Sequence, residues 1–99
     1  MSYQIVLHPE AKKELEDSHQ WYEDRSVGLG KRFIALVDKK INEIALNPLR
    51  FPKTKNGFRE TMMSIFPFII IYEVYEKDQL IFVSYIFHAK RNPRIKYKR

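Results

Sequence analysis

The stretch that most restricts the fold is the apolar run "FPFIIIYEVY" at residues 66–75. β-Branched and aromatic side chains fill both of its alternating faces, which is typical of a central strand buried on at least one side. Two further β-rich runs lie at 58–63 and 80–88, and the polar "EKDQ" at 76–79 predicts a short hairpin turn before the last run. The three runs together predict a meander of adjacent strands.

The first half of the chain has helical periodicity instead. Pro9 pre-sets a first helical turn and Glu10 favours its positive end, so a helix is predicted over 9–25. A second helix is predicted over 29–46, because Asn47-Pro48 stops it and the glycines of "SVGLGKR" make a tight turn before it. The positions at helical spacing are Ala11, Leu15, Ser18 and Tyr22, then Phe33, Val37, Ile41 and Ile44.

Residues 2–8 largely alternate between apolar and polar side chains and predict a first strand. The predicted order is therefore β-α-α-β-β-β, an α+β fold in which a helical hairpin packs on one face of a small, mainly antiparallel four-stranded sheet. A chain of 99 residues predicts one domain over 1–99. Trp21, Tyr22, Phe33 and the isoleucines are predicted to be core.

Composition excludes several classes of protein. Without cysteine there is no disulfide scaffold and no thiolate nucleophile, which fits a reducing cytoplasm. The longest apolar run is too short to cross a bilayer, and the first residues lack the pattern of a signal peptide, so we expect a cytoplasmic protein. No His, Asp or Glu cluster has metal-ligand spacing and no glycine-rich phosphate loop is present, so no metal or cofactor is expected.

The net charge of +6 is concentrated at one end of the chain. Acidic and basic residues balance over 1–87, so the excess comes from Lys90, Arg91, Arg94, Lys96, Lys98 and Arg99. We call residues 89–99 the basic tail. Concentrated positive charge attracts a phosphate backbone, an acidic protein or an anionic surface, although a solvated tail has the same composition.

Five landmarks resemble the RelE/ParE superfamily of toxins from type II toxin–antitoxin pairs. They are "HPEAKKELEDSHQWY", "IALNPLRFP", "GFRETMM", "FPFIIIYEV" and "IFHAKRNP", in that order over nearly the whole chain. The resemblance implies a cognate antitoxin, acidic and encoded in an adjacent gene, that wraps the toxin and silences it. It also implies one of two targets: the ribosome with its messenger RNA for RelE-like members, or DNA gyrase for ParE-like members.

One position favours the ParE-like branch. RelE-like members carry an arginine on the third strand in a pattern like Tyr-Arg-Leu-Val-Tyr, whereas this chain reads Phe-Ile-Ile-Ile-Tyr at 68–72. Ile69 stands where that arginine would be, and its side chain can neither donate a hydrogen bond nor hold a charge. Metal-free RNA cleavage needs such positive donors around the phosphorane.

The strand end and the basic tail keep part of a nuclease pattern. If the chain is a nuclease, the catalytic residues would be His88, Arg91 and Tyr97, because Lys90-Arg91 and Tyr97 match the RelE spacing. His88 can act as a general acid or base near neutral pH, or it can close the last strand. Tyr97 can equally be an aromatic that stacks on the sheet or on a partner.

Contact with the target or the antitoxin is the second expected role of the basic residues, which are Arg59, Lys90, Arg91, Arg94, Lys96 and Lys98. Arg59 matches an arginine on the second strand of the superfamily, and its alternative role is an ion pair with Glu60, Glu73 or Glu76. Three functions stay open: a gyrase inhibitor, a ribosome-dependent endoribonuclease, and a degenerate binding module without catalysis. The first is favoured.

Overall fold

The computed structural model describes residues 3–54 and 56–90. Its elements are β1 (Gln4–Leu7), α1 (Pro9–Arg25), α2 (Leu29–Leu46), β2 (Arg59–Met62), β3 (Phe68–Tyr75) and β4 (Leu80–His88). The predicted order is confirmed, and both helices and β4 have the predicted bounds. The other strands are shorter than predicted at their ends, where pairing with a neighbour stops.

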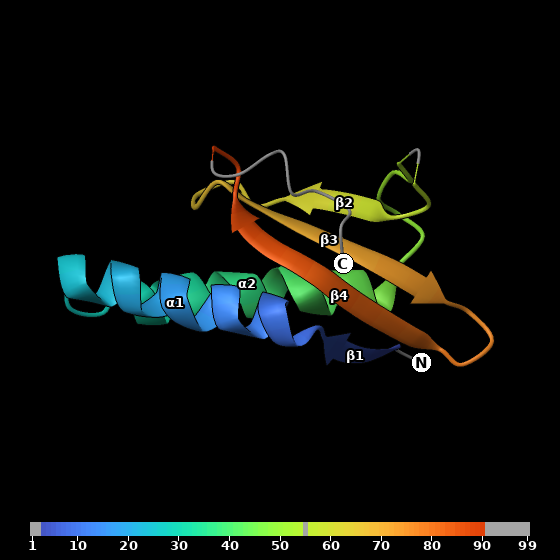
Figure 1. Ribbon diagram of the computed structural model, residues 1–99, viewed down its shortest axis with the longest axis horizontal. Coiled ribbons are helices and arrows are strands. Elements are labelled where there is room, and N and C mark those ends of the chain that lie inside the picture. Colours follow the sequence, from blue (N-terminus) through green and yellow to red (C-terminus); the bar gives the residue numbers. More distant parts are fainter. Residues whose placement is uncertain (1–2, 55, 91–99) are drawn as a thin grey trace.

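The four strands form one mixed sheet in the order β1-β4-β3-β2. β3 pairs antiparallel with both β2 and β4, so the predicted meander and its central strand are confirmed. β1 instead runs parallel to β4, with Gln4 opposite Leu80 and Leu7 opposite Val83. Figure 1 shows the helical hairpin crossing one face of this sheet and extending past its edge.

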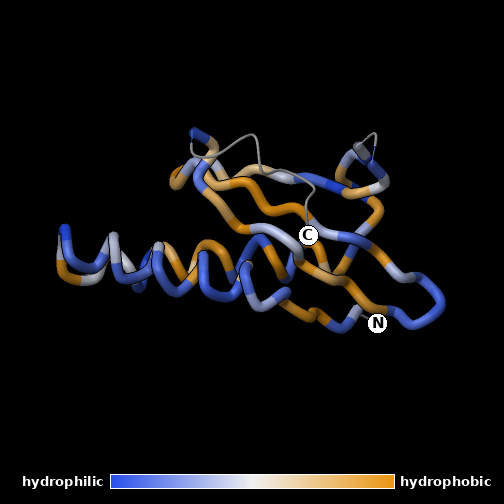
Figure 2. Tube along the Cα trace, in the orientation of Figure 1, coloured by the Kyte–Doolittle hydropathy of each residue, from blue (hydrophilic) through white to orange (hydrophobic). Residues whose placement is uncertain are grey.

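The main core lies between the hairpin and the sheet. From α2 it takes Phe33, Val37 and Ile44, all fully buried. Inward side chains of β3 and β4 complete it, including Ile70 and Tyr72. Figure 2 shows that β3 and β4 are apolar over long stretches, whereas the helices alternate between apolar and polar residues. Burial of these apolar stretches against the apolar side of the hairpin stabilises the arrangement.

Trp21 is a correction to the predicted core. Its side chain is 40% exposed, and the Arg25 guanidinium stacks 3.4 Å from the centre of its ring. Adjacent residues on a helix point about 100° apart, so only one of Trp21 and Tyr22 can face the sheet. Tyr22 takes that position and packs against Phe33 and Phe66.

The turn between the helices is held by a carboxylate. Gly28 caps α2 with a left-handed φ of 87°, and the Glu23 side chain accepts hydrogen bonds from the Gly28 N–H at 2.8 Å and the Gly30 N–H at 3.0 Å. A Cβ atom at Gly30 would lie 2.4 Å from the carbonyl oxygen of His19. Glycine at that position therefore lets the two helices approach closely.

A second apolar cluster lies on the sheet face away from the main core. It contains Phe58, Ile71, Tyr85 and Phe87, with Ile69 packed against it. The pairing of β3 with β4 shifts by one residue beyond Ile71, since Ile71 pairs with Tyr85 and Tyr72 with Val83. Because of this bulge, Ile81 and Val83 face the main core, whereas Tyr85 and Phe87 face the second cluster.

Candidate functional site at the end of β4 and on β2

His88 ends β4 opposite Phe68 and is tied to the backbone that follows it. Its Nδ1 atom accepts a hydrogen bond from the Lys90 N–H at 3.1 Å, and its ring meets the Phe68 ring edge-on with centroids 5.5 Å apart. The Ala89 N–H donates to the Pro67 carbonyl at 2.7 Å. The structure thus gives His88 the strand-closing role that was one of its two predicted roles.

His8 uses the same local arrangement at the start of α1. Its Nδ1 atom accepts from the Glu10 N–H at 3.0 Å, and its ring lies edge-on to Phe82 at 5.8 Å. In both His8 and His88, the Nδ1 atom accepts a hydrogen bond from the backbone N–H two residues later. The His8 bond caps α1 at its N-terminus, where backbone donors lack helical partners.

Arg59 fixes the loop between α2 and β2. Its Nη1 atom donates to the carbonyl oxygens of Phe51 at 2.7 Å and Leu49 at 3.4 Å. The Tyr72 hydroxyl donates to the Pro48 carbonyl at 2.8 Å in the same loop. Burial raises the pKa of Tyr72 to about 12, against the opposing effect of the Arg59 cation. Sequence reasoning did not predict this loop-holding role.

The structure does not bring Arg59 and His88 together. Arg59 pairs with Tyr72 and His88 pairs with Phe68, so the two positions are four residues apart along β3, or about 13 Å. They also lie on strands separated by β3, which adds about 10 Å across the sheet.

Lys90 is exposed beside His88. The predicted positions Arg91, Arg94, Lys96, Tyr97, Lys98 and Arg99 lie outside the described residues.

Ile69 lies in an apolar row that crosses three strands. It pairs with Met62 on β2 and with Phe87 on β4, so all three side chains share the sheet face away from the main core. Ile69 is half-buried against the second apolar cluster. Ile69 therefore stands where a RelE-like arginine would be, and its neighbours on the two adjacent strands, Met62 and Phe87, are apolar as well.

Sequence reasoning missed Glu14, whose Oε1 atom accepts a hydrogen bond from the Ile86 N–H at 3.1 Å. β1 pairs with β4 only from Leu80 to Val83, so the later part of that edge has no partner strand among the described residues. The Glu14 carboxylate takes the place of a strand there. The signal in the sequence is the difference in length between the first and last strands.

Over 3–54 and 56–90, no group of three or more His, Cys, Asp or Glu side chains is placed to hold a metal ion. In the same ranges, neither helix is long and apolar enough to cross a membrane.

Three solved structures with a similar fold are a toxin mutant and two toxin–antitoxin complexes. An E. coli RelE toxin mutant in the free state is 16% identical, with a TM-score of 0.62 over 91% of this chain and 86% of its own. The RelBE2 toxin–antitoxin complex from Mycobacterium tuberculosis is 12% identical, with a TM-score of 0.63 over 89% and 99%. The intact E. coli RelBE complex is 17% identical, with a TM-score of 0.58 over 91% and 100%.

These likenesses establish that the chain has the fold of RelE toxins. A comparison with curated proteins gave no match. The sequence profile of the family described as the ParE toxin of the type II toxin–antitoxin system, parDE, matches residues 5–93. The chain therefore belongs to the ParE toxin family, within the RelE/ParE superfamily of type II toxins.

Proposed function

We propose that this toxin arrests growth by inhibiting DNA gyrase, and that a cognate antitoxin encoded in an adjacent gene neutralises it. The observation that carries the choice of target is Ile69 in its apolar row with Met62 and Phe87. Cleavage of RNA without a metal requires preorganised positive donors around the reacting phosphate. A hydrocarbon row supplies none of them at the position where RelE-like toxins carry an arginine.

Binding to gyrase would use the end of β4 and the basic tail. Lys90 is exposed at that strand end, and the basic tail supplies Arg91, Arg94, Lys96 and Lys98 as further contacts. Arg59 lies on β2, at the sheet edge beyond β3. It would support binding indirectly, by holding the loop through the carbonyl oxygens of Phe51 and Leu49. Positive charge gathered in this way speeds association with an acidic surface.

The test is controlled expression with gyrase and translation followed in parallel. We expect loss of supercoiling by purified gyrase, an SOS response and gyrase-linked double-strand breaks. Growth arrest with normal supercoiling and intact DNA would overturn the choice of gyrase.

A second candidate is a ribosome-dependent endoribonuclease, favoured by His88 beside Lys90 and by the spacing of Arg91 and Tyr97. Primer extension on translated messages would then show cuts at A-site codons after induction. In that case His88→Ala and Arg91→Ala should abolish both cleavage and toxicity. Variants that stay toxic without any cleavage would leave the gyrase proposal standing.

The third candidate is a degenerate module that only binds its partner. Expression without growth inhibition, together with binding of the protein encoded next to this gene, would support it. The same result would remove both toxin mechanisms at once.

A further inference from the structure

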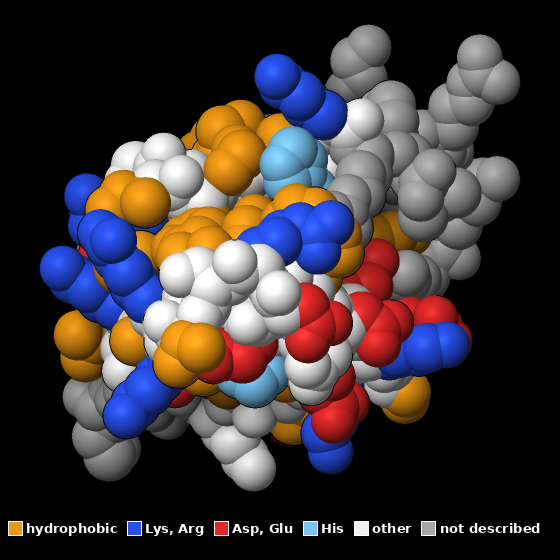
Figure 3. All heavy atoms as spheres, turned by 90° about the vertical axis from the view of Figure 1, so that its left-hand side faces the viewer, with side chains coloured by type: hydrophobic (Ala, Val, Ile, Leu, Met, Phe, Trp, Pro, Cys, Tyr) orange, Lys and Arg blue, Asp and Glu red, His pale blue; other side chains and the backbone are white. Residues whose placement is uncertain are grey.

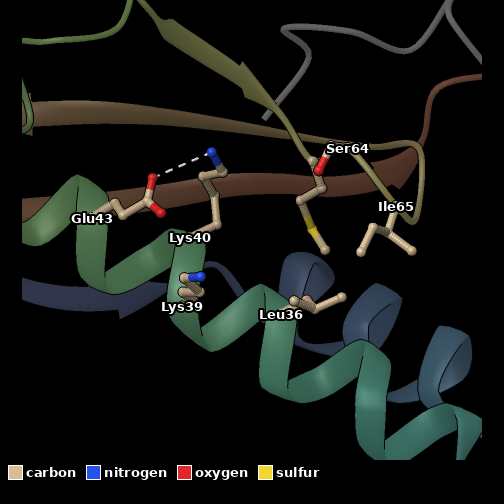
Figure 4. A pocket seen from close by; sticks show the side chains of 7 residues that line it. Leu36, Lys39, Lys40, Glu43, Ser64 and Ile65 are labelled. Atoms are coloured by element: carbon tan, nitrogen blue, oxygen red, sulfur yellow. Dashed lines mark hydrogen bonds and ion pairs between the residues drawn. The ribbon is translucent and has the colours of Figure 1, made fainter.

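A small groove runs between α2 and the loop that joins β2 to β3. Its hollow is about 120 Å³, with apolar walls from Leu36, Met63 and Ile65 (Figure 4). Small-molecule pockets are several times larger, typically about 300–1,000 Å³. The hollow has room for about four waters at about 30 Å³ each, or for one branched or aromatic side chain. Its size therefore suits a single anchor residue of a protein partner.

The loop wall of the groove carries apolar surface to solvent. Ile65 is 58% exposed, while the neighbouring Met63 and Phe66 are buried. Single exposed apolar residues are common on proteins. Ile65 differs because it lines a hollow that already has Leu36 on the opposite wall. A side chain placed there would remove both residues from water.

The rim of the groove is positively charged. Lys39 and Lys40 line it from α2, and the one carboxylate, Glu43, pairs with Lys40 at 3.3 Å. Lys40 also lies 5.4 Å from the centre of the Phe51 ring, and Arg50 lies 5.3 Å from the same ring. Lys39 is exposed and has no ion-pair partner among residues 3–54 and 56–90. The rim therefore favours an acidic occupant.

The other helix of the hairpin has the opposite charge. Figure 3 looks at the protruding end of the hairpin and shows most carboxylates of this view gathered toward one side, with some lysines or arginines beside them and more lysines and arginines elsewhere on this end. An acidic segment would be repelled by the α1 side and attracted by the α2 side. Charge thus selects which face of the hairpin such a segment can use.

We propose that this groove, which we call the α2 groove, receives an apolar side chain from an acidic segment of the antitoxin. The inference rests on the proposed function for the existence of that partner and adds where it is anchored. A nucleic acid fits less well, because it would need several cations along its backbone or aromatic faces for stacking. Here the walls are aliphatic and part of the rim charge is already paired.

The experiment uses the intact toxin and, as probe, the purified protein encoded by the reading frame adjacent to its gene. Ile65→Asp places a charge in the hollow, and Lys39→Glu reverses the charge of the rim. Val27→Asp and Lys77→Glu are matched controls, since Val27 is 96% exposed at the hairpin tip and Lys77 is exposed in the turn after β3. Dissociation constants and association rates are measured at two salt concentrations.

We expect Ile65→Asp to weaken binding about tenfold or more, as loss of a central apolar anchor does. Lys39→Glu should slow association several-fold at low salt, with a smaller effect at high salt. Both controls should stay within about twofold of the wild type, because they lie outside the groove. Lys39→Glu changes an exposed position, so it tests the groove even where Ile65→Asp lowers stability.

The outcomes separate the two proposals. If the probe binds the wild type and both groove variants equally, the α2 groove is not its anchor and the antitoxin proposal stands. If the probe does not bind the wild type, the antitoxin proposal fails and the groove proposal fails with it. If the groove variants instead change binding of a 20-nucleotide RNA or DNA, or the oligomeric state of the toxin alone, the occupant is a nucleic acid or a second copy and the proposal is overturned.

Discussion

The two helices of the hairpin do different work although they have almost the same length. In α1 only Ala11 and Ser18 are buried, and the helix carries six carboxylates against three basic residues. α2 buries Phe33, Val37 and Ile44 among others and carries four basic residues against two carboxylates. The first helix is therefore a polar, acidic cover, and the second is the apolar, basic helix on which the core is built.

The difference lies in the kind of contact that each helix makes. α1 is joined to its surroundings by polar groups at three points: the His8 cap, the Glu14 bond to Ile86 and the Glu23 bonds to the turn. α2 is joined mainly by hydrocarbon contacts with β3 and its neighbours. Changes at these three polar points of α1 should act through single hydrogen bonds, whereas changes at the buried positions of α2 should act through cavities and lost burial.

The largest expected effect comes from the apolar helix. Phe33→Ala removes a fully buried ring that packs against Tyr22, Phe66 and Phe68, so it should lower the free energy of unfolding by about 3–5 kcal/mol. Trp21→Ala in α1 is the matched aromatic control, and its stacking on Arg25 is worth about 0.5–1 kcal/mol. Urea denaturation measures both. Equal losses would contradict the division between the helices.

The contact between the helices is the next most sensitive point. Gly30→Ala would place a Cβ atom 2.4 Å from the His19 carbonyl oxygen, so one helix must move away from the other. Overpacking of this kind costs about 1–3 kcal/mol. Ala35→Gly, at an exposed position of the same helix, is the control for backbone propensity. A Gly30→Ala protein as stable as the wild type would show that the hairpin can adjust at no cost.

A smaller effect is expected where α1 meets the edge of β4. Glu14→Ala removes the acceptor of the Ile86 N–H and should destabilise the protein by about 0.5–1.5 kcal/mol. Glu14→Gln keeps an acceptor oxygen and should recover most of that loss. Thermal unfolding gives the stabilities, and amide hydrogen exchange of Ile86 shows whether the bond itself is lost. Unchanged exchange in Glu14→Ala would mean that the carboxylate does not protect this edge.

Periodicity predicted the helices and the central strand because each has a long, regular pattern. Residues 9–25 and 29–46 repeat at helical spacing and end at proline or glycine, and the apolar run before Tyr75 leaves little choice for β3. The parallel pairing of β1 and the loop held by Arg59 were not predictable, because each depends on which distant backbone comes close and local spacing carries no information about that. The exposure of Trp21 could have been predicted, since helical spacing already placed Tyr22 in the apolar repeat.

The candidate site shows the same limit. Ile69 was identified from its position in a pattern, and its packing between Met62 and Phe87 follows from strand register. The α2 groove could not be predicted, since Ile65 and Leu36 lie far apart in sequence and meet only through the fold. In the sequence alone, Lys39 and Lys40 have the pattern of an ordinary solvated helix face, and only the fold places Ile65 beside them.

The smallest expected effect concerns the carboxylate that links the two helices, and it depends on pH. The Gly28 N–H, helped by those of Gly30 and Lys31, lowers the pKa of Glu23 below its usual 4.5. The unfolded chain therefore binds a proton at higher pH than the folded one, so stability rises with pH in this range. The contribution is complete above the usual pKa and is lost as the pH falls through the lowered one.

Glu23→Gln should remove this pH-dependent part while keeping one acceptor oxygen for the turn. The stability difference between wild type and variant should be constant above about pH 5.5 and shrink as the pH falls toward 3, by the same linkage. Glu16→Gln is the matched control, since it removes a carboxylate from the exposed face of α1 without touching the turn. A wild-type advantage that persists undiminished at pH 3 would mean that the charge of Glu23 does not hold the acidic helix to the basic one.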